Sequence, residues 1–241
     1  MMLLYADDIA NGTDSVGKLQ DMVDVLEKYC DKWGLTVNES KTKIVVFKKG
    51  GIRKKNERWT YKNKTIEIVS VYKYLGVLFA STLCWAQAVY TLALLAKKAQ
   101  GMLRKYSNVC GGLPVSVALQ LFDKTIVPVA LYGAEIWGHV QYKPLEDVQL
   151  RFCKTLLGLP LHASNLATSG ECGRFPLFIS TYTRCIKYWL KILCMPSSRY
   201  VKACYCMLKG LDENGKRTWV THVREILMRY GFGEVWYAQG D

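Results

Sequence analysis

Two adjacent aspartates stand near the beginning of the chain, with apolar residues on both sides. The run reads Leu3-Leu4-Tyr5-Ala6-Asp7-Asp8-Ile9. Aspartate is a poor strand former, so we expect the pair at the tip of a hairpin between a strand over residues 2–5 and a partner beginning at Ile9. Because two neighbouring carboxylates repel each other, a divalent metal ion is their natural partner.

The charge of the chain is distributed unevenly. The formal net charge of the 241 residues is +13. Residues 1–50 contain 7 Lys and 8 Asp or Glu (net −1), residues 51–107 contain 11 Lys or Arg and 2 Glu (net +9), and residues 108–241 contribute the remaining +5. A basic central block indicates contact with a polyanion, although a well-solvated lysine surface is the alternative.

The first 81 residues alternate between helix and strand patterns. A long helix follows the aspartates, with Thr13 or Asp14 as its N-cap and Gly34 as its stop. We expect a buried strand over 44–47, a hairpin of 58–61 with 65–69, and a further strand over 72–79 that contains Gly76.

Beyond residue 82 the apolar residues recur at helical spacing. We expect one helix through Trp85 to Tyr106, a second that starts at Pro114 and is interrupted or ended by Pro128, and a third from Pro144 to about Gly158. Further helices are expected over 178–193, 199–209 and 218–230. The predicted fold is α+β, divided into a mixed domain over 1–81, a helical domain over 82–160 and a helical region over 161–241.

Four cations share one face of the first of these helices. Lys97 and Lys98 precede Arg104 and Lys105 by seven residues, so the two pairs lie above one another and off the apolar stripe. This face is a candidate phosphate-binding surface, and a solvated helix face is the alternative.

The cysteines and the hydropathy pattern narrow the class of protein. Nine cysteines at irregular spacing, without a secretory signal, predict reduced thiols in an intracellular protein. Cys204, Cys206 and His222 lack the paired spacing of a zinc finger or knuckle. No stretch reaches the roughly 18 apolar residues of a membrane span, so we expect a protein in the nucleus or cytoplasm, soluble or within a ribonucleoprotein.

Four motifs in order carry a resemblance to a known family. Tyr5-Ala6-Asp7-Asp8 is followed by Trp33-Gly34-Leu35, then by Asn38 with Lys41-Thr42, then by Lys73-Tyr74-Leu75-Gly76. This order resembles the C-terminal half of the palm of the non-LTR (LINE-type) retrotransposon reverse transcriptases. The later runs over 131–138 and 152–160 look like the thumb side of the same enzymes, so the first domain would be a partial palm and the second a thumb.

The resemblance implies a role for each matching residue. Asp7 would bind Mg²⁺ and Asp8 would support it, and Lys41 would lie near the phosphates of the incoming nucleotide. Tyr74, Leu75 and Gly76 would belong to the primer grip, which supports the primer backbone. The cations Lys97, Lys98, Arg104 and Lys105 would contact the backbone of the duplex that RNA template and primer form, independently of sequence.

Enzymes of this family need a further metal-binding aspartate and a fingers region, both before the Asp-Asp box. Only four residues precede Tyr5 here. We therefore expect two-metal polymerisation to be incomplete in this chain alone, unless a longer chain supplies the missing parts. Three alternatives stay open: a non-catalytic nucleic-acid-binding protein, the open reading frame of a decayed element, and an unrelated basic α+β module with an accidental Asp-Asp hairpin.

Overall fold

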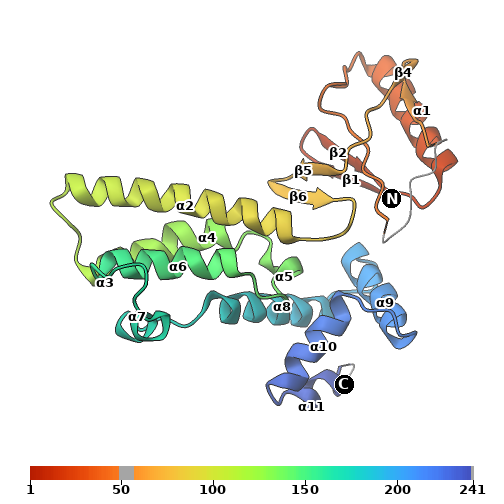
Figure 1. Ribbon diagram of the computed structural model, residues 1–241. Coiled ribbons are helices and arrows are strands. Elements are labelled where there is room, and N and C mark those ends of the chain that lie inside the picture. Colours follow the sequence, from red (N-terminus) through yellow and green to blue (C-terminus); the bar gives the residue numbers. More distant parts are fainter. Residues whose placement is uncertain (49–56, 240–241) are drawn as a thin grey trace. The chain divides into compact units, whose positions relative to one another are not determined.

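The computed structural model describes residues 1–48 and 57–239 (Figure 1). Part of the basic central block, residues 51–56, lies outside the described residues. The chain forms two compact units, Met1–Trp85 and Ala86–Asp241. The second unit includes most of the residues that were assigned to the helical domain and the helical region.

In its described residues, the first unit consists of a long helix and three two-stranded antiparallel hairpins. The pairs are β1 (Met2–Tyr5) with β2 (Asp8–Asn11), β3 (Thr60–Tyr61) with β4 (Lys64–Thr65), and β5 (Val71–Tyr74) with β6 (Val77–Ala80). Helix α1 spans Val16–Trp33 and ends at Gly34, whose φ of 63° is easily adopted by glycine. The first unit combines a helix with antiparallel strands, and helices follow in the second unit. This arrangement confirms the α+β prediction.

The core of the first unit forms between α1 and the β3–β4 hairpin. Val23 of α1 packs with Trp59, Tyr61 and Ile66, all of them buried. The indole Nε1 of Trp59 also donates to the carbonyl of Val16 at 2.9 Å. This contact satisfies the buried indole N–H and holds the hairpin on the first turn of α1.

Three predicted details of the first unit are wrong. Ser15, not Thr13 or Asp14, is the N-cap of α1, and the Thr13 hydroxyl accepts the N–H of Ser15 at 3.3 Å instead. The expected strand over 44–47 is reduced to one parallel bridge between Ile44 and Ile68, and Phe47 is half exposed. The expected strand over 72–79 is two strands joined by a turn at Leu75 and Gly76.

The second unit is entirely helical in its described residues. Its helices are α2 (Ala86–Val109), α3 (Val115–Leu121), η1 (Phe122–Ile126), α4 (Val127–Ala130), α5 (Ala134–Trp137), α6 (Lys143–Leu156), α7 (Asn165–Glu171), α8 (Leu177–Leu193), α9 (Tyr200–Glu213), α10 (Trp219–Arg229) and α11 (Gly233–Tyr237). The sequence predicted α2, α3, α6, α8, α9 and α10, and it did not predict the short helices α5, α7 and α11. None of the described helices has the length and apolarity of a membrane span.

Pro128 does not end the second helix but changes its winding. The helix passes from α3 into one π-helical segment, η1, and then into α4, whose first turn contains Pro128. Proline lacks the N–H that an α-helix would use here, so a local widening of the helix is a way to continue past it.

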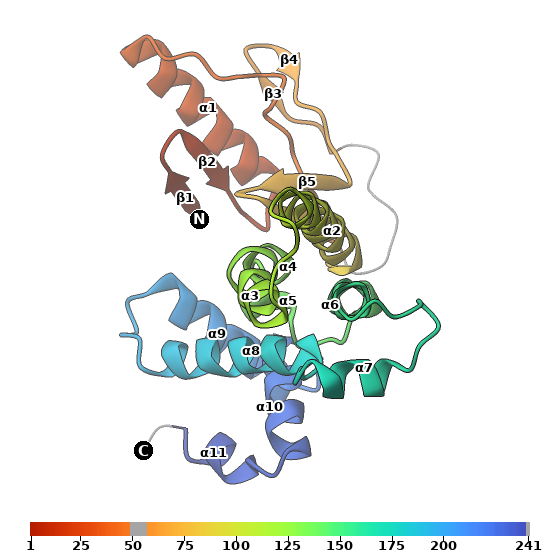
Figure 2. The ribbon, with the colours of Figure 1, turned by 90° about the vertical axis from the view of Figure 1, so that its left-hand side faces the viewer.

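The second unit contains a group of helices around α2 and a separate hydrophobic cluster around α8. Helix α2 lies beside α4 and α6, as Figures 1 and 2 show. The Gln100 side chain of α2 donates to the carbonyl of Val148 in α6 at 2.6 Å. A separate cluster joins α8 to the C-terminal helices, and its buried members are Trp189, Ile192, Tyr205, Val220, Val223, Leu227 and Trp236.

Candidate nucleic-acid and metal site

The Asp7–Asp8 pair occupies the tip of the β1–β2 hairpin, as predicted. Tyr5 pairs with Asp8, which leaves Ala6 and Asp7 as a two-residue loop. Ala6 has a φ of 51°, a conformation that residues with a Cβ rarely adopt. Both aspartates are exposed. The strained loop therefore presents the two consecutive carboxyl groups to solvent.

The donor set at this tip fits one hard divalent cation. Carboxylate oxygens are preferred Mg²⁺ ligands, and Mg²⁺ keeps water or phosphate oxygens in its other positions. In residues 1–48 and 57–239, no group of three or more His, Cys, Asp and Glu side chains gathers as a metal site. Asp7 and Asp8 therefore have no third such ligand in this part of the chain. Among the described residues, Cys204, Cys206 and His222 also do not gather as a metal site.

Lys41 sits in a tight turn built by Asn38. The Asn38 side-chain oxygen accepts the N–H of Lys41 at 3.1 Å and the hydroxyl of Ser40 at 2.7 Å. The main-chain oxygen of Asn38 accepts the N–H and the hydroxyl of Thr42 at 3.0 and 2.9 Å. Asparagine favours this geometry because its side chain mimics a backbone turn. The Asn38, Lys41 and Thr42 motif thus has a local structural cause, and it leaves Lys41 exposed.

Tyr72 of β5 connects the Lys41 turn to the β5–β6 hairpin. Its hydroxyl donates to the main-chain carbonyl of Lys41 at 2.9 Å. This contact joins two of the sequence-predicted site segments, the Lys41 turn and the hairpin that carries Tyr74, Leu75 and Gly76. Sequence reasoning did not identify Tyr72 as a site residue, because a contact across 31 residues leaves no local pattern.

The turn at Leu75 and Gly76 is a tight two-residue hairpin loop. Tyr74 pairs with Val77, and Leu75 and Gly76 have φ values of 46° and 84°. Positive φ at both central residues is the type I′ geometry that matches the twist of hairpins. Gly76 adopts it without strain, whereas Leu75 does so against its preference. The turn therefore projects from the sheet as a defined tip.

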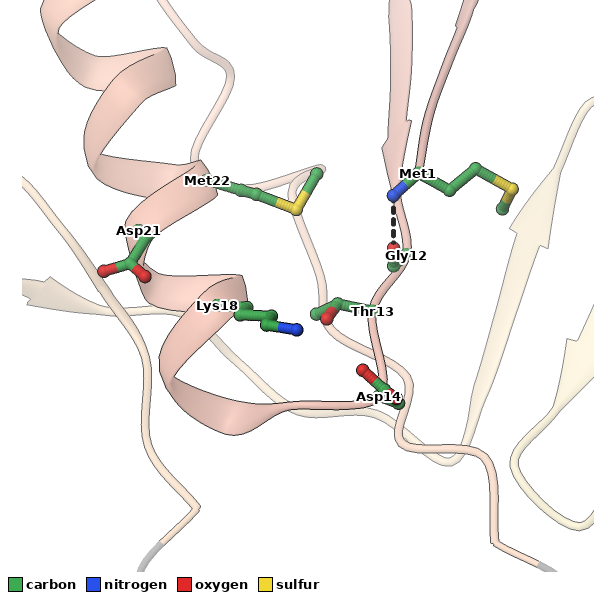
Figure 3. Close-up of a pocket in the computed structure, with 7 residues that line it drawn as sticks. All are labelled: Met1, Gly12, Thr13, Asp14, Lys18, Asp21 and Met22. Atoms are coloured by element: carbon green, nitrogen blue, oxygen red, sulfur yellow. Dashed lines mark hydrogen bonds between the residues drawn. The ribbon is translucent and has the colours of Figure 1, made fainter.

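An open hollow of about 530 Å³ lies at the other end of the β1–β2 hairpin (Figure 3). Its lining consists of Met1, Gly12, Thr13, Asp14, Lys18, Asp21 and Met22. Lys18 and Met22 point from α1 toward the hairpin, and the Asp21 carboxylate points away (Figure 3). The hollow includes neither aspartate of the tip nor Lys41, so it is not the predicted site.

The four cations of α2 belong to the second unit. Lys98, Arg104 and Lys105 are exposed and Lys97 is half-buried. The opposite side of α2 is buried through Val89, Leu92 and Ala96. The four cations thus lie off the buried stripe of α2, on a solvent side that also carries Leu94 and Met102.

Comparison with known proteins identifies the class of the N-terminal part. Residues 1–79 match the family model described as reverse transcriptase (RNA-dependent DNA polymerase). Searches of curated proteins and of solved structures gave no match. Residues 1–79 are therefore similar to a segment of a reverse transcriptase, which supports the resemblance at the level of this family. Nucleic acids are the partners that this class implies.

Proposed function

We propose that this chain is the palm-and-thumb part of a reverse transcriptase of the non-LTR (LINE) type. In this proposal Asp7 and Asp8 hold Mg²⁺, and Lys41 and the turn of Tyr74, Leu75 and Gly76 act near the primer end. The basic face of α2 binds the template–primer duplex. The observation that carries the proposal is the family match over residues 1–79, since this range includes the Asp7–Asp8 tip, the Lys41 turn and the β5–β6 turn.

The exposed tip suits a carboxylate pair that must meet a metal ion carried by a nucleotide. In a two-metal polymerase, bound Mg²⁺ activates the primer hydroxyl and stabilises charge on the leaving pyrophosphate. Asp7 in the loop and Asp8 at the first position of β2 contribute consecutive carboxylates to that task. Lys41 contributes a positive charge from an ordered turn, where it can stabilise negative charge on a leaving phosphate.

We further propose that this chain alone does not extend a primer. The described residues supply one carboxylate pair and no third His, Cys, Asp or Glu ligand beside it. Two cations about 3.5–4 Å apart need more protein ligands than one such pair provides. A template–primer extension assay with the purified chain and Mg²⁺ tests this point. Steady extension that disappears in Asp7→Asn would show that the chain is complete.

Duplex binding by α2 is the part of the proposal that the isolated chain can test. We expect Lys98→Glu, Arg104→Glu and Lys105→Glu together to weaken binding of an RNA–DNA hybrid, measured by fluorescence anisotropy. Loss of phosphate contacts also lowers the slope of log affinity against log salt concentration, by about 0.9 for each contact. The reason is that fewer counterions are released when the duplex binds.

A matched variant separates a local effect from a change in overall charge. Lys187→Glu, Lys191→Glu and Lys216→Glu alter three exposed lysines outside α2. Each triple variant changes the net charge by −6, from +13 to +7. If both triple variants bind the hybrid equally well, α2 is not the duplex-binding face.

A second candidate function, binding without catalysis, is favoured by one observation. The basic face of α2 lies in a different compact unit from the Asp7–Asp8 tip. Asp7→Ala with Asp8→Ala should therefore leave hybrid affinity unchanged in the absence of Mg²⁺. Binding that survives this change would show that the chain binds the hybrid independently of its carboxylate pair, as a non-catalytic binding protein does.

A further inference from the structure

An exposed aromatic pair stands on the outer side of α1. Tyr29 is 54% exposed and Trp33 is 62% exposed, and their ring centroids are 6.4 Å apart with a 50° tilt. The residues are four apart, so they occupy successive turns of one helix face. All seven tryptophans lie in the described part of the chain, and only Trp33 is exposed among them. Exposed apolar side chains that are contiguous, unlike ones scattered singly, are candidate interaction sites.

The charges around the pair are positive on the solvent side. Lys28 and Lys32 are exposed and flank the rings, and the Lys32 ammonium lies 5.6 Å from the centroid of the Trp33 ring. This distance is in the range of a cation–π contact. Cations beside exposed aromatic rings suit a ligand that carries both negative charge and flat π surfaces.

The acidic residues of the same turns are engaged elsewhere. The Asp31 carboxylate pairs with the Lys62 ammonium at 2.6 Å, and a Glu27 carboxylate oxygen accepts the N–H of Lys62 at 2.9 Å. Both acids therefore face the β3–β4 loop. The Lys62 ammonium offsets the charge of Asp31 there, and the edge that carries the two rings keeps the positive charges of Lys28 and Lys32.

We propose that Tyr29, Trp33, Lys28 and Lys32 form a binding surface for single-stranded nucleic acid. Bases stack on the two rings, and the two lysines contact the phosphates that flank those bases. Stacking on aromatic side chains and a basic track along the backbone are together the means by which proteins bind single strands without sequence preference. The surface is independent of the duplex-binding face proposed for α2, which lies in the other unit.

Trp33 supplies a direct readout. Titration of the full chain with oligouridylate or oligothymidylate of about ten nucleotides should quench the emission of the exposed indole. The titration is made in the variant that carries Lys98→Glu, Arg104→Glu and Lys105→Glu, so that α2 does not contribute. We expect Trp33→Phe to remove most of the quenching and to keep the affinity, because phenylalanine still offers a ring for stacking.

Affinity measured by anisotropy tests the two kinds of contact separately. Trp33→Ala and Tyr29→Ala should each weaken binding about tenfold, the effect of losing one stacked base. Lys28→Gln with Lys32→Gln should lower the salt slope by about 1.4, or about 0.7 for each phosphate contact to a single strand. All four side chains are exposed, so the folds of the variants should be unchanged, which circular dichroism checks.

Val25 provides the matched control. It is 65% exposed and lies one turn before Tyr29 on the same face, but it has no π surface. Val25→Ser should leave oligonucleotide affinity unchanged. Equal affinity of the Trp33→Ala variant and its parent would overturn the proposal, as would a saturated complex with unquenched emission. The proposal would also fail if sedimentation showed that the chain self-associates through this face and that Val25→Ser makes the oligomer dissociate.

Discussion

The Tyr72 hydroxyl donates a hydrogen bond of 2.9 Å to the main-chain carbonyl of Lys41. The contact ties a polar turn to β5. Within the turn, Asn38 accepts the N–H groups of Lys41 and Thr42, and the Glu39 carboxylate accepts from the Lys64 ammonium at 2.9 Å. The main chain at Lys41 is therefore held by a residue of the hairpin that turns at Leu75 and Gly76. The hydrogen bond joins two segments that we propose to act near the primer end.

Tyr72→Phe should release the Lys41 turn without disturbing the hairpin. The change removes one partly exposed hydrogen bond, so we expect the free energy of unfolding to fall by about 1 kcal/mol or less. Hydrogen exchange of the Lys41 and Thr42 amides should become faster. Tyr74→Phe, the same chemical change two residues along β5, is the control. Equal exchange rates in the two variants would show that Tyr72 does not hold the turn.

Glu146 of α6 caps the beginning of α8 from outside that helix. Its two carboxylate oxygens accept the N–H groups of Leu177 and Phe178 at 2.9 and 2.8 Å. Pro176 precedes these residues and offers no side-chain cap. Glu146→Ala leaves two partly buried donors without a partner, so we expect a loss of about 1–3 kcal/mol in the free energy of unfolding. Urea denaturation measures it.

Glu146→Gln separates the loss of charge from the loss of the acceptor. The amide oxygen can still accept one of the two N–H groups, so this variant should lose less than Glu146→Ala. If both variants unfold at the same urea concentration as the parent, the cap does not stabilise α8.

The sequence was sufficient for elements whose cause is local. The Asp7–Asp8 tip followed from poor strand propensity between apolar residues, and Gly34 ended α1 because glycine readily adopts a positive φ. The apolar residues at helical spacing in α2, α6 and α8 predicted those helices, because each pattern is long enough to be unambiguous. The roles of Asp7, Lys41 and the α2 cations came from resemblance, and they stay predictions.

Other features were not predictable from local patterns. The turn at Leu75 and Gly76 was taken for a strand interior because leucine at positive φ is rare, so tertiary context must impose it. Residues 44–47 have a strand composition but make only the Ile44–Ile68 bridge. The exposed pair of Tyr29 and Trp33 was also missed. Apolar residues at helical spacing do not by themselves say which side of a helix other elements cover, and Trp33 is 62% exposed.

The cysteines should fall into two classes of reactivity. Cys84, Cys110, Cys194, Cys204 and Cys206 are exposed, and Cys30, Cys153, Cys172 and Cys185 are buried. Burial raises the pKa of the Cys153 thiol to about 12, with the adjacent Cys172 as a further cause, and burial raises that of Cys185 to about 12. Alkylation requires an accessible thiolate.

Brief treatment of the native protein with N-ethylmaleimide at neutral pH should therefore add five groups, and treatment in denaturant should add nine. Intact-mass spectrometry counts them, and peptide mapping assigns them. Rapid native labelling of Cys153 or Cys185 would contradict the packing of α6 and α8 described above.

Acid should destabilise the second unit through a pair of stacked histidines. The rings of His139 and His222 are 4.3 Å apart and nearly parallel. Burial first, and then the neighbouring His222, lower the pKa of His139 to about 4, and burial also lowers the pKa of His222. As the pH falls, the two imidazoles are protonated near pH 6.5 in the unfolded chain and only at lower pH in the folded chain. The free energy of unfolding therefore falls as the pH drops from about 6.5 toward 4.

We expect His139→Asn to remove much of this pH dependence. A shift from 6.5 to about 4 corresponds to a loss of at most about 3 kcal/mol across the window. Urea denaturation at pH 7.5 and at pH 4.5 measures the difference for the parent and for each variant. His162→Asn, which replaces an exposed histidine, is the matched control and should follow the parent. Parallel pH profiles for the parent and His139→Asn would show that His139 is protonated equally readily in the folded and the unfolded chain, which would contradict the prediction.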